Sequence, residues 1–189
     1  MAKNISRINH RCRSIQARVK VRFLNIFSSC SPNTIGNWST ASFSMRVHAV
    51  RAIEEGEEIT SAYTDVIKSS IFRQADLEPY DMVCTCAACS KGNESDIARV
   101  MLQFYDLARD LNPENKSLEV ALRELELLEM EGLECIKMYR DVLEVVTDLY
   151  IEEEHKENAV YYGKKLYKAQ CAIGQGDRYS KYRDLDGVL

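Results

Sequence analysis

Beyond Gly92-Asn93 the hydrophobic positions of the chain recur every three or four residues, with the period of an α-helix. Asn112-Pro113, Gly132 and a short charged turn divide this region into four segments, and Ser95 is the predicted N-cap of the first. Each apolar stripe is wide enough to need a partner surface, so the pattern predicts an antiparallel helical array over about residues 95–174. The stripes are Ile97, Val100, Met101, Phe104, Leu107, Ala108 and Leu111; Leu118, Ala121, Leu122, Leu125 and Leu128; Leu133, Ile136, Tyr139, Val142, Leu143, Val146, Leu149 and Tyr150; and Ala159, Tyr162, Leu166, Ala169 and Ile173.

The segment before residue 92 has a different pattern. From Phe43 to Tyr63 apolar and polar residues alternate around a polar turn at residues 54–58, which favours short strands over a helix. Residues 66–77 predict a short helix. The fold class is therefore α+β: a β-rich segment over residues 1–92, a helical region over residues 93–175, and a frayed tail over residues 176–189.

The last two predicted helices resemble one tetratricopeptide-like hairpin. Core packing is the favoured meaning of their apolar stripes, and a peptide-binding groove is the less favoured one.

Composition is that of an ordinary globular protein, with 46% hydrophobic and 29% charged residues in 189. No apolar run is long enough to span a bilayer, and the N-terminal thirty residues do not resemble a secretory signal. Seven cysteines, an odd number, fit reduced thiols or metal ligands better than a disulfide framework. We therefore expect an intracellular protein of the nucleus or the cytoplasm that is not bound to a membrane.

Three of the cysteines, Cys84, Cys86 and Cys89, form a CxCxxC cluster. Such clustering is rare outside metal sites, and thiolates are the ligands that structural zinc prefers. The residues between them offer no core face of a helix or strand, which argues against three merely buried thiols. The cluster therefore predicts three ligands of a tetrahedral zinc ion, with the fourth ligand coming from elsewhere.

Further motifs occur in a fixed order along the first half of the chain. Asn9-His10 and residues 29–33, Ser-Cys-Ser-Pro-Asn, form the two halves of an NHSCxPN motif, followed by GEEIT at residues 56–60 and then by YxD at residues 63–65. Together with the CxCxxC cluster they resemble the C-terminal half of a SET domain with its post-SET zinc segment. The CxCxxC spacing and the helical tail are similar to the SET-and-MYND branch of the protein-lysine methyltransferases and to fungal-type SET proteins.

The resemblance implies a role for each motif residue. Cys30 is implied as the fourth zinc ligand, beside Cys84, Cys86 and Cys89. The implied contacts to S-adenosyl-L-methionine come from Asn9, His10 and Tyr80, the last being an aromatic residue ahead of the cysteine turn. Tyr63 matches the tyrosine whose hydroxyl orients the substrate amine at the site of methyl transfer.

The interruption of NHSCxPN is the most unusual feature of the sequence. Deleting residues 11–28 leaves an uninterrupted NHSCSPN, so we interpret these eighteen residues as an insertion, most simply a translated intron. The alternative is a genuine loop or added strand, because residues 15–23 alternate as a strand does. Residues 1–53 hold nine Lys or Arg and no acid, but five of the nine lie in the interruption, so the basic charge does not predict nucleic-acid binding.

The resemblance implies a methyltransferase that uses S-adenosyl-L-methionine to modify a lysine of a histone or another protein. The chain begins just before the NHSCxPN motif, so we expect a truncated product with weak or no activity alone. The alternative function is a non-catalytic, zinc-stapled module whose C-terminal helices bind a protein partner.

Overall fold

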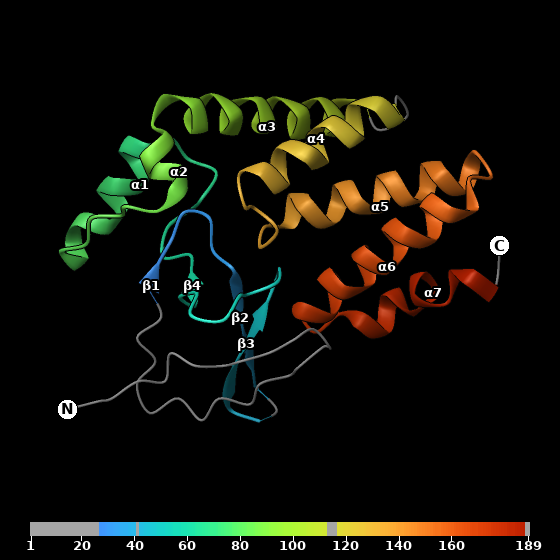
Figure 1. Ribbon diagram of the computed structural model, residues 1–189, viewed down its shortest axis with the longest axis horizontal. Helices are drawn as coiled ribbons and strands as arrows, with labels where there is room; N and C mark the ends of the chain where they lie inside the picture. The colour runs from blue at the N-terminus through green and yellow to red at the C-terminus, as the bar shows by residue number, and fades with distance from the viewer. Residues whose placement is uncertain (1–26, 41, 113–116, 188–189) are drawn as a thin grey trace.

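A computed structural model describes residues 27–40, 42–112 and 117–187 (Figure 1). The predicted cofactor residues Asn9 and His10, and the predicted insertion up to residue 26, lie outside the described residues. In the described part the strands are few and short and the helices many, so the predicted α+β class is confirmed.

The strands form two small sheets that present the SET-like motifs. Strand β1 (Phe27–Ser28) pairs in parallel with β4 (Thr60–Ser61), and β2 (Thr34–Ser39) pairs antiparallel with β3 (Ser44–Ala49). The last two residues of the predicted insertion are thus a strand beside the end of GEEIT. The loop of residues 29–33 connects β1 to β2, so pairing on both sides fixes the position of Cys30.

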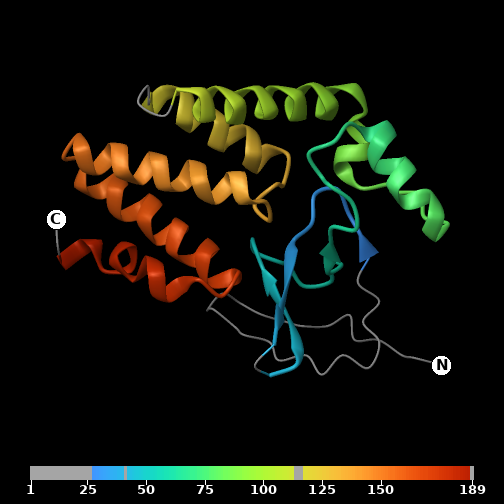
Figure 2. The same ribbon diagram turned by 180° about the vertical axis from the view of Figure 1, so that it is seen from behind.

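Two short helices and one long helix follow the strands. Helix α1 (Ser70–Leu77) leads through a 3-10 turn (Glu78–Tyr80) to α2 (Ala87–Lys91), whose N-cap is Cys86. Helix α3 (Asn93–Leu111) then begins directly after Gly92, which has a φ of 57°. Figures 1 and 2 show α1 and α2 on one side of the strands, with the later helices on the other.

Helices α4 (Leu118–Met130), α5 (Lys137–Glu152) and α6 (Lys156–Ala172) correspond to the last three of the four predicted helices and lie each beside the next (Figure 2). They enclose the main hydrophobic core, to which α5 contributes most. The buried core side chains of these helices are Ala121, Leu125, Leu128, Tyr139, Val142, Leu143, Val146, Tyr150, Ala159, Val160 and Leu166. Helices α5 and α6 form a hairpin; its tetratricopeptide-like character stays a prediction. No helix in the described ranges is both long and apolar enough to cross a membrane.

Two details of α3 differ from the predictions. Helix α3 starts before Ser95, so Ser95 is not an N-cap but a buried residue of the first turn. The predicted apolar stripe of α3 is exposed, whereas its buried face carries Ser95, Ala98, Arg99 and Leu102. Ser95 and Arg99 have polar partners on neighbouring segments, and these contacts determine which face of α3 is buried.

The C-terminal segment also differs from the frayed tail that the sequence suggested. Residues 176–187 form two 3-10 turns (Gly176–Tyr179 and Leu185–Gly187) around the short helix α7 (Ser180–Arg183). Tyr182 and Leu185 are buried against the main core, and the hydroxyl of Tyr182 donates to Asp148 over 3.0 Å. Helix α7 is too short to be stable alone, and burial of these two side chains stabilises the segment against the core.

Candidate metal centre

The four predicted zinc ligands converge on one point. The Sγ atoms of Cys30, Cys84, Cys86 and Cys89 all lie within 4.8 Å of one another. Cys30 is 3.8 Å from Cys84 and 3.6 Å from Cys89 between sulfur atoms, although 54 and 59 residues separate them in the sequence. The fold thus joins the loop of residues 29–33 to the CxCxxC cluster.

The sulfur positions fit a four-coordinate zinc ion. Zinc–thiolate bonds of about 2.3 Å in a tetrahedron give sulfur–sulfur edges of about 3.8 Å. The edges from Cys30 to Cys84 and from Cys30 to Cys89 have nearly this length. Four protein thiolates fill the coordination shell, so the arrangement suits a structural ion and leaves no open position for a substrate.

The pKa shifts of the cysteines also indicate that the cluster suits a bound cation. A hydrogen bond from Cys30 lowers the pKa of Cys86 to about 3. The same hydrogen bond, together with burial, raises the pKa of Cys30. One thiolate therefore forms readily, whereas four neighbouring thiolates repel one another and require a central positive charge.

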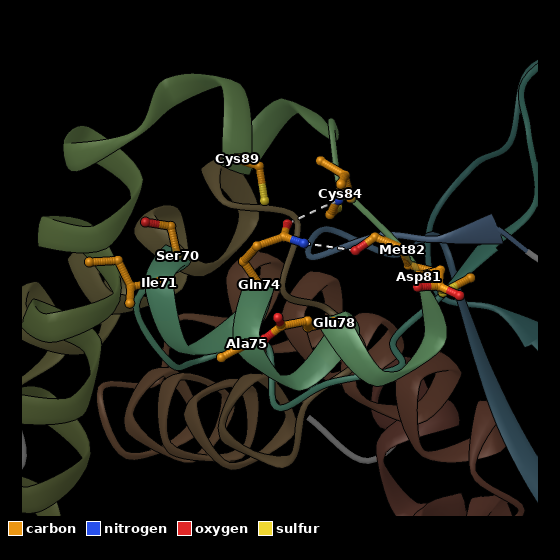
Figure 3. A pocket seen from close by; sticks show the side chains of 10 residues that line it. Ser70, Ile71, Gln74, Ala75, Glu78, Asp81, Met82, Cys84 and Cys89 are labelled. Carbon is orange, nitrogen blue, oxygen red and sulfur yellow. Dashed lines mark hydrogen bonds between the residues drawn. The ribbon is translucent and has the colours of Figure 1, made fainter.

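Gln74 of α1 holds the cysteine turn in place (Figure 3). Its side-chain amide donates to the carbonyl of Met82 over 2.7 Å and accepts from the backbone N–H of Cys84 over 3.2 Å. These two bonds satisfy the backbone on the approach to the cluster, where no strand or helix does so. Together with Ser70 and Ile71, these residues line a hollow between α1 and the cysteine turn.

Asn33 connects the loop of residues 29–33 to the GEEIT motif. Its buried side chain donates to Glu57 Oε1 over 2.9 Å and to the carbonyl of Glu58 over 2.7 Å, and its Oδ1 accepts from the backbone N–H of Thr60 over 2.8 Å. The side-chain amide of Asn33 thus donates two hydrogen bonds, and its oxygen accepts one, at the same time. Asn33 therefore fixes the strand that ends two residues before Tyr63.

Hydrogen bonds to backbone carbonyls connect the same loop to Arg51, which follows β3, and to the helical region. Arg99 of α3 donates to the carbonyl of Cys30 over 3.1 Å, and Arg51 donates to the carbonyl of Pro32 over 2.8 Å. Ser31 donates its hydroxyl to the carbonyl of Glu131 over 2.6 Å. The Glu131 carboxylate lies 3.4 Å from Arg99 and is almost fully buried.

Sequence reasoning missed Asn33, Arg51, Arg99 and Glu131 as residues that position the site. Only Asn33 carried a signal, as the last residue of NHSCxPN. Arg99 lies within a helix of strongly amphipathic sequence, where an arginine ordinarily faces solvent. Its burial depends on partners far away in the sequence, which periodicity does not reveal.

Tyr63 and Tyr80 are the other predicted site residues that the structure describes, and they differ in exposure. Tyr63 lies two residues after the end of β4 and is 46% exposed; Tyr80, at the end of the 3-10 turn after α1, is 67% exposed. Both aromatic rings are therefore accessible to a ligand.

Comparison with known proteins identifies the N-terminal part of the chain. A family model described as the SET domain matches residues 2–64, which include both halves of NHSCxPN and end just after Tyr63. Residues 2–64 are therefore similar to the SET domain family. The histone-lysine N-methyltransferase set5 of Schizosaccharomyces pombe is 41% identical over 83 residues, which cover 41% of this chain and 26% of that relative. The predicted resemblance to SET domain protein-lysine methyltransferases is confirmed.

The chain thus spans about a quarter of the length of the curated relative it matches. The SET match ends before the CxCxxC cluster, yet Cys30 inside the match and three cysteines beyond it form one cluster. The four cysteines therefore attach the segment after the SET match to the SET motif loop.

Proposed function

We propose that this chain is part of a protein-lysine N-methyltransferase that uses S-adenosyl-L-methionine, with a structural zinc ion at the four cysteines. The observation that carries the proposal is the convergence of Cys30 from the NHSCxPN motif with Cys84, Cys86 and Cys89. In a chain with SET similarity, this contact holds the cysteine segment against residues 29–33, the second half of the NHSCxPN motif. Four reduced thiols also agree with an intracellular location.

The chain's own residues have separable roles in this proposal. S-adenosyl-L-methionine supplies the electrophilic methyl group. Asn9, His10 and Tyr80 are the residues inferred to bind it, through amide, imidazole and aromatic contacts. The hydroxyl of Tyr63 orients the substrate amine, which must lose its proton before its lone pair can attack. The zinc ion is structural and keeps the cysteine segment in position.

The test is methyl transfer by the full-length gene product with radiolabelled S-adenosyl-L-methionine and a mixture of histones. We expect label on lysine, and we expect Tyr63→Phe to reduce transfer by at least tenfold because the orienting hydroxyl is lost. Tyr161→Phe is the matched control, since Tyr161 is also exposed but lies on α6, remote from the motifs. Wild-type protein that binds the cofactor but gives equal transfer with Tyr63→Phe would refute the role of Tyr63.

A second candidate function is a non-catalytic module that binds another protein. The exposed apolar face of α3 favours it, because exposed apolar residues gathered on one helix are typical of interaction surfaces. This face consists of Ile97, Val100, Met101, Phe104, Leu107 and Leu111. Calorimetric titration with S-adenosyl-L-methionine separates the two functions: the full-length product binds the cofactor if it is an enzyme and gives no heat if it is only a binding module.

A further inference from the structure

Arg73 of α1 is a fully buried cation whose hydrogen bonds with the described residues leave it incompletely satisfied. Its Nη1 donates to the carbonyl of Lys68 and lies 3.4 Å from Asp96 Oδ1. Its Nε has no hydrogen-bond partner among the described residues. Its Nη2 points to Cys89, with 3.9 Å between the nitrogen and the sulfur. The side chain therefore joins α1 to the cysteine cluster.

Asp96 is a weak counterion for this guanidinium. Its carboxylate already accepts from the backbone N–H of Ser70 over 2.7 Å and from the Ser70 hydroxyl over 2.6 Å. The Asp96 side chain is 20% exposed, whereas that of Arg73 is 0% exposed. A buried charge without a close, well-aligned partner is destabilising, so Arg73 requires a further anion on its other side.

Two other arginines in the described ranges have more complete sets of partners than Arg73, whose Nε is unpaired there. Arg109 of α3 donates to both oxygens of the almost buried Glu124, over 2.8 and 2.7 Å. Arg99 combines the Glu131 carboxylate with hydrogen bonds to Ser95 and to the carbonyl of Cys30. The contrast identifies the cysteine cluster as the anion that Arg73 faces.

We propose that Arg73 is the charge-balancing residue of the zinc–thiolate centre, and that its guanidinium donates to the zinc-bound thiolate of Cys89. Four thiolates and one Zn²⁺ carry a net charge of −2, and part of that charge lies on each sulfur. A buried guanidinium at hydrogen-bond distance for sulfur stabilises the charged cluster against protonation and loss of metal. The inference rests on the zinc assignment made under the proposed function.

The arrangement also gives α1 a role in the metal site. Arg73 and Gln74 are adjacent residues, and Gln74 holds the backbone at Cys84 while Arg73 faces the sulfur of Cys89. One turn of α1 therefore supports both the position and the charge of the cysteine turn. Such outer residues typically contribute about 10–100-fold to metal affinity.

The test compares zinc affinities of the whole 189-residue chain by competition with a chromophoric chelator. Arg73→Met retains much of the aliphatic volume but no charge, and Arg73→Lys retains the charge. We expect Arg73→Met to weaken zinc binding about 10–100-fold, and Arg73→Lys to recover most of the loss. Arg109→Met is the control: it also removes a guanidinium, partly exposed and paired with Glu124, so its zinc affinity should stay within about twofold of the wild type.

Cobalt(II) substitution adds a spectroscopic readout. Loss of the donor to Cys89 should shift the thiolate-to-cobalt charge-transfer band in Arg73→Met and leave it unchanged in Arg109→Met. If Arg73→Met does not fold, Arg73→Gln replaces it as the neutral variant. Zinc-loaded wild type with equal affinity in the neutral variant, or Arg73→Lys as weak as the neutral variant, overturns the proposal. Wild-type protein that folds without zinc overturns instead the zinc assignment itself.

Discussion

Replacing Asn33 by aspartate tests whether the contact between the NHSCxPN loop and GEEIT organises this part of the molecule. The substitution is nearly isosteric and keeps the oxygen that accepts from Thr60. It removes the donations to Glu57 and to the carbonyl of Glu58, and it sets a second carboxylate beside that of Glu57. Only hydrogen bonding and charge change, because the volume stays the same.

The magnitude follows from the lost interactions. A hydrogen bond to a charged group contributes about 1.5–3 kcal/mol, and one to a neutral carbonyl about 0.5–1.5 kcal/mol. The sum is about 2–4.5 kcal/mol, and repulsion between the two carboxylates adds to it. We therefore expect Asn33→Asp to lower the free energy of unfolding by about 4 kcal/mol at pH 7, a large share of the roughly 5–15 kcal/mol of a typical domain.

The loss of stability in Asn33→Asp should depend on pH in one direction. The introduced carboxyl faces Glu57 and a carbonyl, so its pKa is raised on folding, and its protonated form regains a donor. The deficit of Asn33→Asp relative to the wild type should therefore be largest at neutral pH and shrink as the pH falls through that raised pKa.

The assay is urea unfolding of the zinc-loaded chain followed by circular dichroism at pH 7 and pH 5. Asn37→Asp is the control, since Asn37 is only partly buried and donates one hydrogen bond, to the carbonyl of Ile173 over 2.8 Å. We expect a loss of about 1 kcal/mol for the control. A loss below 1 kcal/mol for Asn33→Asp, or a loss equal to that of the control, would show that the contact does not organise the loop.

Three further predictions concern the cluster, GEEIT and the insertion. Cys86→Ser should release zinc and lower the urea midpoint, measured by metal analysis and circular dichroism, because binding at such sites stabilises the fold; unchanged metal content contradicts this. Partial burial would raise the pKa of Glu57, but hydrogen bonds from Glu54 and Asn33 and the charge of Arg51 lower it, so stability should fall as the pH drops below the unfolded value of 4.5. Glu57→Gln should flatten that acid limb of the stability curve. Removal of residues 11–28 should restore methyl transfer to a full-length product that carries them, and equal activity with and without them would show that they belong.

The sequence predicted the four cysteines of the candidate metal centre, but it did not predict the residues that hold them in position. Cysteine spacing and motif order led to Cys30, Cys84, Cys86 and Cys89, because metal ligation needs particular atoms that few other residues offer. The support came from backbone carbonyls and buried charges, such as the contact between Arg99 and the carbonyl of Cys30. Any residue has a carbonyl, so this contact leaves no mark in the sequence.

Among the helices, too, apolar contacts were predicted from the sequence and polar contacts were not. The stripes of α4 and α5 predicted most of the buried residues of these helices, and that of α6 predicted Ala159 and Leu166, because the three helices pack on one another mainly through apolar surface. Helix α3 instead buries Ser95 and Arg99 against Glu131 and exposes Phe104 and Leu107. Amphipathic periodicity fails where a polar network determines which face of a helix is buried.

Zinc-edge X-ray absorption of the purified chain tests the central claim most directly, because it reports the ligands and the bond lengths together. The account predicts one zinc ion per chain with four sulfur neighbours at about 2.3 Å, and one sulfur fewer or no zinc in Cys30→Ser. Folded protein that lacks zinc, or a zinc ion with nitrogen or oxygen neighbours in place of sulfur, would contradict it.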